Sequence, residues 1–168
     1  AFEVIEAHWL FNVPWKDIEV VVHPQSVVHS MVEFVDGSVK AHIGSPNMRL
    51  PIQYALFYPD RVSNCSIARF NPVETGTMTF ERLNPERYPC FQLGLDIAMR
   101  GGSWPAALCG ADDAAVEMFL SRRIGFLDIA PVIRESLEEH TPVTDPSPQD
   151  ALSAAAEARK RVLEIVRA

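Results

Sequence analysis

The chain has 168 residues, of which 48% are apolar, and its 15 basic and 22 acidic residues give a formal net charge of −7. The apolar residues are numerous enough to form a core, which excludes a disordered chain. The excess of acidic residues excludes a general nucleic-acid binder, because proteins of that class need a basic stripe to neutralise phosphates. No apolar run reaches the ~20 residues that cross a membrane, and the three cysteines form neither a disulfide framework nor a CxxC site, which points to a reducing cytosol.

The first predicted element is a helix over residues 2–12. Phe2, Ile5 and Trp9 recur at helical spacing, and Pro14 ends the pattern. The sequence opens directly inside this pattern, without an initiator Met or an N-cap residue, and a natural N-terminus rarely does so. We therefore expect the chain to be a fragment of a longer protein.

A short strand and a hairpin are expected next. The β-branched run at residues 18–22 predicts a buried strand, and residues 30–43 predict a hairpin. Asp36-Gly37 is a preferred two-residue turn, and a turn of that length places Glu33 opposite Lys40. A helix over residues 48–58 follows.

The second half of the chain is expected to be helical. Residues 59–86 have no clear period and resemble a long connector, whereas residues 87–168 predict four helices with short loops, which is typical of a bundle. The sequence thus predicts an α+β chain with three parts: a partial α/β domain with a hairpin at residues 1–58, a linker at 59–86, and a C-terminal four-helix bundle at 87–168.

Several residues mark the ends of the bundle helices. Pro89 suits a first helical turn, Gly101-Gly102 ends that helix, and Ser103 can cap the next one. Ser147 followed by Pro148 predicts the start of the last helix. This last helix is alanine-rich and carries residues at helical spacing, namely Leu152, Ala155, Arg159, Val162 and Val166.

Three segments could carry chemistry. Glu3 and Glu6 share a helix face and could hold a hard divalent ion, although two acids in a first turn more often only suit the helix dipole. The polar segment 23–30 either presents side chains to a pocket or forms a turn that satisfies its own backbone, and the residues leave both open. The loop 44–49 could cover a ligand, but an ordinary strand-to-helix connection is favoured. No dinucleotide loop, P-loop, HExxH or GxSxG motif is present.

Several ordered motifs resemble those of the 1-deoxy-D-xylulose 5-phosphate reductoisomerase family. The similar segments cover essentially the whole chain: Glu3–Phe11, His23–Met31, Asp36–Val39, Gly44–Ile52, Tyr88–Cys90, Ala114–Leu120 and Ile124–Ile129. One segment departs, because the chain reads Gly110-Ala111-Asp112-Asp113-Ala114 where the family usually has Asn-Ala-Ala-Asn-Glu.

The resemblance implies an oxidoreductase of non-mevalonate isoprenoid biosynthesis. Such an enzyme converts 1-deoxy-D-xylulose 5-phosphate to 2-C-methyl-D-erythritol 4-phosphate with NADPH and a divalent ion, Mg²⁺ or Mn²⁺, which acts as a Lewis acid. The expected partners are a small phosphorylated sugar and a second copy of the chain in a homodimer, with no nucleic acid and no membrane. The expected location is cytoplasmic, in a bacterial cytosol or alternatively a plastid.

The resemblance also implies site residues. Glu3 matches a glutamate that binds the metal and the substrate. Ser26 matches a substrate-binding position and Met48 a cofactor-binding position. His29 would not contact the ligands itself but would position residues that do. The family's other metal ligands, its phosphate-binding Asn-Lys and its NADPH domain lie upstream of the residues matched here. The isolated fragment is therefore expected to be inactive; the alternative is a non-catalytic interaction or binding module derived from such an enzyme.

Overall fold

The computed structural model describes residues 1–167, which divide into two compact units. The hairpin unit is Val20–Leu83, and the helical unit combines Ala1–Glu19 with Asn84–Ala168. Small antiparallel strand pairs in the first unit and packed helices in the second confirm the α+β class. The expected domain boundaries near residues 58 and 86 stay a prediction. No helix among the described residues is long and apolar enough to span a membrane.

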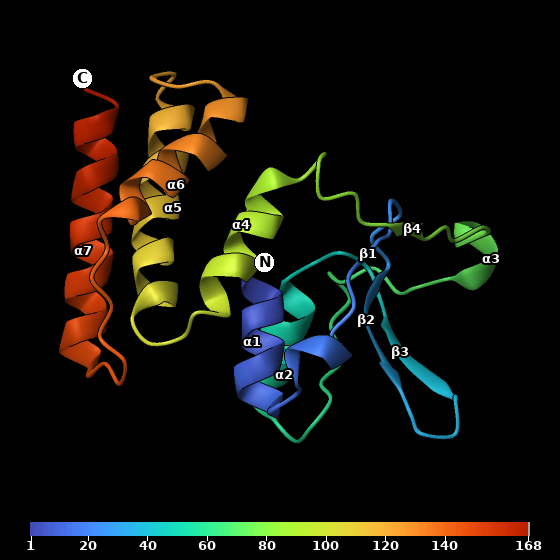
Figure 1. Ribbon diagram of the computed structural model, residues 1–168. Coiled ribbons are helices and arrows are strands. Elements are labelled where there is room, and N and C mark those ends of the chain that lie inside the picture. The colour runs from blue at the N-terminus through green and yellow to red at the C-terminus, as the bar shows by residue number, and fades with distance from the viewer. Residues whose placement is uncertain (168) are drawn as a thin grey trace. The chain divides into compact units, whose positions relative to one another are not determined.

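The helical unit contains five α-helices and two short 3₁₀ turns (Figure 1). The helices are α1 (Phe2–Phe11), α4 (Pro89–Ala98), α5 (Trp104–Leu120), α6 (Ile129–Glu138) and α7 (Pro148–Ile165), and the 3₁₀ turns are η1 (Trp15–Asp17) and η2 (Phe126–Asp128). The helix predicted over residues 2–12 and the four predicted bundle helices are thus confirmed.

The predicted start of α7 is confirmed in detail. Ser147 is the N-cap, and its hydroxyl accepts a hydrogen bond from the Asp150 N–H at 3.2 Å. The Asp150 carboxylate in turn accepts from the Ser147 N–H at 2.9 Å, and Pro148 occupies the first turn, where its missing N–H costs nothing. The hydrogen bonds from Ser147 hold the pKa of Asp150 below its ordinary value.

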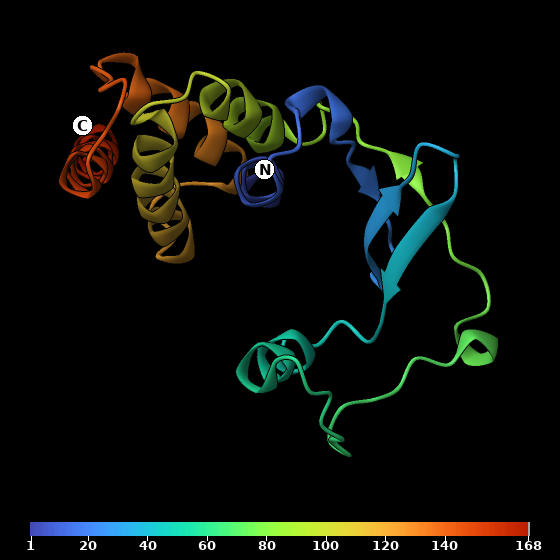
Figure 2. The same cartoon turned by 90° about the horizontal axis from the view of Figure 1, so that it is seen from below.

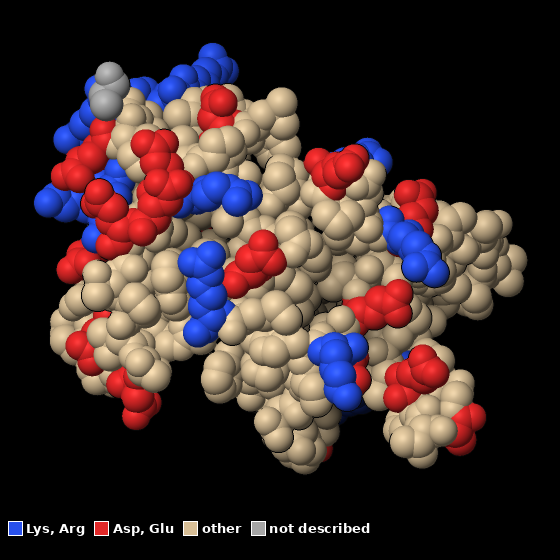
Figure 3. Space-filling view, in the orientation of Figure 1, with Lys and Arg blue, Asp and Glu red and all other residues tan. Residues whose placement is uncertain are grey.

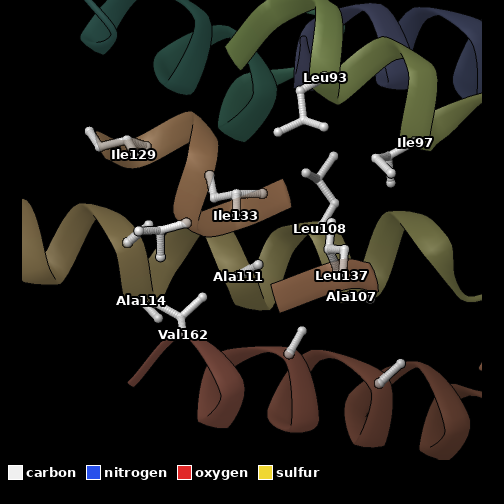
Figure 4. Close-up of a cluster of buried hydrophobic side chains, with 14 residues drawn as sticks. Leu93, Ile97, Ala107, Leu108, Ala111, Ala114, Ile129, Ile133, Leu137 and Val162 are labelled. Atoms are coloured by element: carbon white, nitrogen blue, oxygen red, sulfur yellow. The ribbon is translucent and has the colours of Figure 1, made fainter. Parts of the chain in front are cut away.

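The core lies around α5, which packs against α4, α6 and α7 (Figure 4). Leu93 and Ile97 come from α4, Leu108 and four alanines from α5, Ile133 from α6, and two further alanines with Val162 from α7. The most extensive helix contact is between α5 and α7, and Figure 2, which looks nearly along α7, shows α5 beside it. Charged side chains gather over the C-terminal part of α7 (Figure 3), where Lys160 pairs with Glu164.

Of the residues that recur at helical spacing in α7, only Val162 is fully buried, and the small side chains of Ala154 and Ala158 are buried beside it. Leu152 is 65% exposed. Arg159 is partly exposed and pairs with Glu117 of α5. α5 and α7 lie close together, so mainly small side chains fit between them.

Ser103 occupies the N-cap of α5, as predicted, but its hydroxyl does not cap the helix. Only 1% exposed, Ser103 accepts a hydrogen bond from the Val143 N–H at 2.9 Å, and its Oγ lies 3.0 Å from Nε2 of the buried His140. The hydroxyl still has its own proton to donate, and it donates to Nε2 in the tautomer that leaves this nitrogen unprotonated. The expected local cap is thus replaced by a link to residues about forty positions along the chain.

The Ser103–His140 pair predicts acid sensitivity of the bundle. Burial and the nearby Arg161 lower the pKa of His140 below its ordinary 6.5, and Glu157 acts in the opposite direction. The unfolded chain therefore binds the proton more readily, so stability is complete above about pH 6.5 and falls as pH drops toward the folded-state pKa. We expect the urea midpoint at about pH 5 to be lower than at about pH 7.

His140→Gln is the control, because it should remove this part of the pH dependence. Ser103→Ala should cost about 1–3 kcal/mol, since it removes the hydroxyl that lies against Nε2 of the buried His140 and accepts from the Val143 N–H. A pH dependence unchanged by His140→Gln would contradict the assignment.

The hairpin unit consists of two strand pairs and two helices (Figure 2). Its elements are β1 (Val21–Val22), β2 (Val28–Glu33), β3 (Val39–Ile43), α2 (Arg49–Phe57), α3 (Pro72–Thr75) and β4 (Glu81–Arg82), with β1 paired to β4 and β2 to β3. The strand predicted over residues 18–22 is only partly confirmed, because its partner β4 pairs with just two residues. Within Val20–Leu83 only Gly44 is buried, so the apolar residues of β2, β3 and α2 are largely exposed.

The hairpin is confirmed, but its predicted register was wrong by one residue. Glu33 pairs with Val39, and Lys40 lies opposite Val32. The loop has three residues, because the Phe34 N–H donates to the Ser38 carbonyl at 2.8 Å and Gly37 takes φ 80°. The expected Glu33–Lys40 pair is therefore absent from the register.

Candidate functional site

Glu3 lies in the first turn of α1, and its side chain is 91% exposed. Val4 on the same turn is buried, and Ile5 packs against the core of the helical unit. These two apolar contacts hold α1 in place and leave the Glu3 carboxylate facing solvent. The terminal ammonium of Ala1 lies 3.9 Å from it.

A complete metal site does not form from this chain's described residues. Among residues 1–167, no three His, Cys, Asp or Glu side chains come together in a group that could hold a metal ion. Mg²⁺ demands near-octahedral oxygen ligands, and Glu3 offers one carboxylate. The donor set therefore fits a single ligand of a divalent ion, and the remaining ligands have to come from elsewhere.

Ser26 lies in the turn between β1 and β2, in a segment that is tied down by distant residues. Gln25 is held by Thr79, whose N–H donates to Oε1 at 3.1 Å. His23 Nδ1 lies 2.8 Å from the Thr79 carbonyl, and its ring stacks on Phe80 at 4.6 Å. The segment is thus a turn in which the side chains of His23 and Gln25 are hydrogen-bonded to Thr79. Ser26 itself is exposed and has φ 51°, and its N–H donates to the His23 carbonyl.

Thr79 was missed by sequence reasoning. It lies 54 residues from Gln25, in a stretch with no periodic pattern, so no local signal connects the two. It holds the side chains of His23 and Gln25, which precede Ser26 in the turn. The rigid turn leaves the Ser26 hydroxyl available to a ligand.

His29 and Met48 are linked through the loop that follows β3. Nε2 of His29 lies 3.2 Å from the carbonyl of Gly44, and the Gly44 N–H donates to the Val27 carbonyl at 2.9 Å. Met48 lies at the other end of this loop, directly before α2, and is 71% exposed. His29 therefore anchors the loop, and the loop presents an exposed thioether side chain.

The sequence is similar to proteins of one family. A family profile described as "DXP reductoisomerase C-terminal domain" matches residues 43–161. The 1-deoxy-D-xylulose 5-phosphate reductoisomerase of Acetivibrio thermocellus is 48% identical over 165 residues, which is 98% of this chain and 43% of that protein. The enzyme of Bacillus cereus strain AH187 is 46% identical over 162 residues, or 96% of this chain and 43% of that protein. The chain thus spans about 43% of the length of these curated relatives.

Solved structures show the same likeness. The reductoisomerase of Zymomonas mobilis in complex with NADPH superposes with a TM-score of 0.90 at 40% identity, over 99% of this chain and 44% of that chain. A DOX-P reductoisomerase structure with fosmidomycin and magnesium gives a TM-score of 0.88 at 32% identity, over 98% of this chain and 43% of that chain.

Proposed function

The chain belongs to the DXP reductoisomerase family, and from that membership we propose that it is part of an enzyme that converts 1-deoxy-D-xylulose 5-phosphate to 2-C-methyl-D-erythritol 4-phosphate. The observation that carries the proposal is 48% identity over 98% of the chain. The cofactors of this enzyme are NADPH and a divalent ion, and its location is the cytoplasm. Relatives solved with NADPH and with magnesium support the choice of cofactors.

Glu3 is proposed as one ligand of the divalent ion and as a contact of the substrate. An exposed carboxylate on a well-anchored helix is suited to this role, since its oxygens face solvent and are open to an ion. The bound ion would polarise the carbonyl of the substrate. The other oxygen ligands would come from residues outside this sequence.

Ser26, Met48 and His29 are proposed for binding roles. The Ser26 hydroxyl would donate to an oxygen of the sugar phosphate, from a turn whose backbone Gln25 holds. Met48 would lie against the NADPH through its flexible thioether. His29 would position Met48 by holding the start of the loop at Gly44.

The protein is also proposed to be a homodimer. β2 and β3 form a two-stranded sheet, so each strand keeps a free edge, and Val32, Phe34 and Val39 are exposed on it. An exposed apolar edge strand tends to pair with another chain.

A chimera tests the proposed function. The upstream part of the Acetivibrio thermocellus enzyme would be joined to this chain, in place of the matched segment. The chimera is expected to oxidise NADPH in the presence of 1-deoxy-D-xylulose 5-phosphate and Mg²⁺ and to sediment as a dimer. The unmodified relative is the control. A folded chimera without turnover would overturn the proposed activity, and a folded monomer would overturn the dimer.

A further inference from the structure

The helical unit has a second feature, a partly open cavity of about 600 Å³ lined by residues of α1, α4, α5, η2 and α6. Its walls are mostly apolar and include Phe91, Leu93, Leu108, Leu127 and Ile133. A cavity of this size and lining is in the range that proteins use to bind small organic molecules. None of the residues proposed above for substrate, metal or cofactor lines it.

One acidic side chain, Asp112 of α5, reaches this apolar cavity. It is partly buried, and within residues 1–167 no hydrogen bond or salt bridge engages its carboxylate. Burial and the neighbouring Asp113 raise the pKa of Asp112, and the terminal ammonium of Ala1 offsets part of that rise. Although this ammonium acts on it at a distance, the partly desolvated carboxylate has no hydrogen-bonded or ion-paired group among the described residues, and this favours an added cation.

We propose that this cavity binds a small apolar organic amine, whose hydrocarbon part fills the space between Leu93, Leu108 and Ile133 and whose ammonium pairs with Asp112. The other charged side chain at the cavity is Arg87, which is exposed and directed over the Tyr88 ring at 5.7 Å. The site is independent of the proposed reductoisomerase activity. Asp112 also lies in the segment where the sequence departs from the family pattern.

Cys90 provides a reporter inside the same cavity. Burial, followed by the charge of Asp112, raises the pKa of the Cys90 thiol. The pKa of Cys109 is raised as well, first by burial and then by Asp113 ahead of Asp112. Asp112 thus acts on both thiols, whereas Asp113, which is exposed, acts on Cys109 and not on Cys90.

The test compares naphthalen-2-ylmethylamine with its neutral analogue naphthalen-2-ylmethanol by NMR titration of this chain. The amine should bind with a Kd on the order of 0.1–1 mM and about fivefold more tightly than the alcohol. Asp112→Asn should abolish this preference, whereas the matched variant Asp113→Asn should keep it. Asp112→Glu retains the charge and should keep it too, which separates loss of charge from loss of fold.

Alkylation by iodoacetamide locates the site. The amine should slow the reaction of Cys90 and leave Cys65 and Cys109 unchanged. Without any ligand, Asp112→Asn should speed the reaction of Cys90, and Asp113→Asn should speed that of Cys109. The proposal would be overturned if the amine did not bind, or if amine and alcohol bound with equal affinity. It would also be overturned if a folded Asp112→Asn variant kept the preference for the amine, or if the amine protected all three cysteines equally.

Discussion

Gly110→Ala should destabilise the helical unit by about 2–4 kcal/mol, although alanine is the better helix former by roughly 1 kcal/mol. A Cβ atom at Gly110 would lie 2.0 Å from the carbonyl oxygen of Ala155 in α7. The obstacle is backbone, so no side-chain rotation relieves it, and α5 and α7 would have to move apart. Because this is the most extensive helix contact, the loss should spread across the core. Urea unfolding followed by circular dichroism measures it.

Gly101→Ala is the matched control in the same unit. Gly101 has φ 70°, but nothing lies within 4 Å of an added Cβ, so the change should cost only the backbone strain of about 1–2 kcal/mol. Adding Ala155→Gly to Gly110→Ala should give no recovery, since the Ala155 side chain is not the obstacle. Equal or increased stability of Gly110→Ala would show that the two helices are not held this closely.

The same close contact explains which parts of the bundle were predictable. The ends of the helices depend on local signals, such as Pro89 in a first turn and Ser147 with Asp150 three residues later, and these were read correctly. The buried face of α7 depends on its partner. Because α7 passes close to Gly110, it buries Ala154 and Ala158 and leaves Leu152 exposed, which its own sequence pattern does not indicate.

The hairpin shows a different limit. Asp36-Gly37 allows either a two-residue turn or a three-residue loop, and both place Gly37 at positive φ. In the structure the Asp36 carboxylate accepts hydrogen bonds from the N–H and the hydroxyl of Ser38, at 2.9 and 2.6 Å, and the three-residue loop forms. This choice shifts the register by one residue, so the turn motif alone could not decide the partner of Lys40.

The residues of the candidate site could be named from the sequence, but the contacts that hold them could not. Glu3, Ser26, His29 and Met48 were named from the family resemblance, and the roles of all four remain proposals. Their supporting contacts could not be read from the sequence, because Thr79 and Gly44 lie 54 and 15 residues from the side chains they hold. A local pattern carries no information about such pairs.

Glu3→Gln in the chimera with the Acetivibrio thermocellus upstream part should lower turnover by at least about 100-fold. The substitution keeps the shape of the side chain and removes the charge, and loss of a metal ligand forfeits several kcal/mol of transition-state stabilisation. NADPH binding should be nearly unchanged, because the cofactor is not proposed to contact Glu3. The Mg²⁺ concentration for half-maximal activity should rise, which a purely structural change would not cause.

Glu6→Gln is the matched control, because Glu6 is a second exposed glutamate one turn further along α1. It should leave turnover and the Mg²⁺ requirement unchanged, which separates a specific ligand from the general negative charge of the first turn. Calorimetry of this chain alone should show no stoichiometric Mg²⁺ site, since one carboxylate cannot satisfy the ion. If Glu3→Gln left both turnover and the Mg²⁺ requirement intact, Glu3 would not be a metal ligand, and the exposed carboxylate would serve only to favour the N-terminal end of the helix dipole.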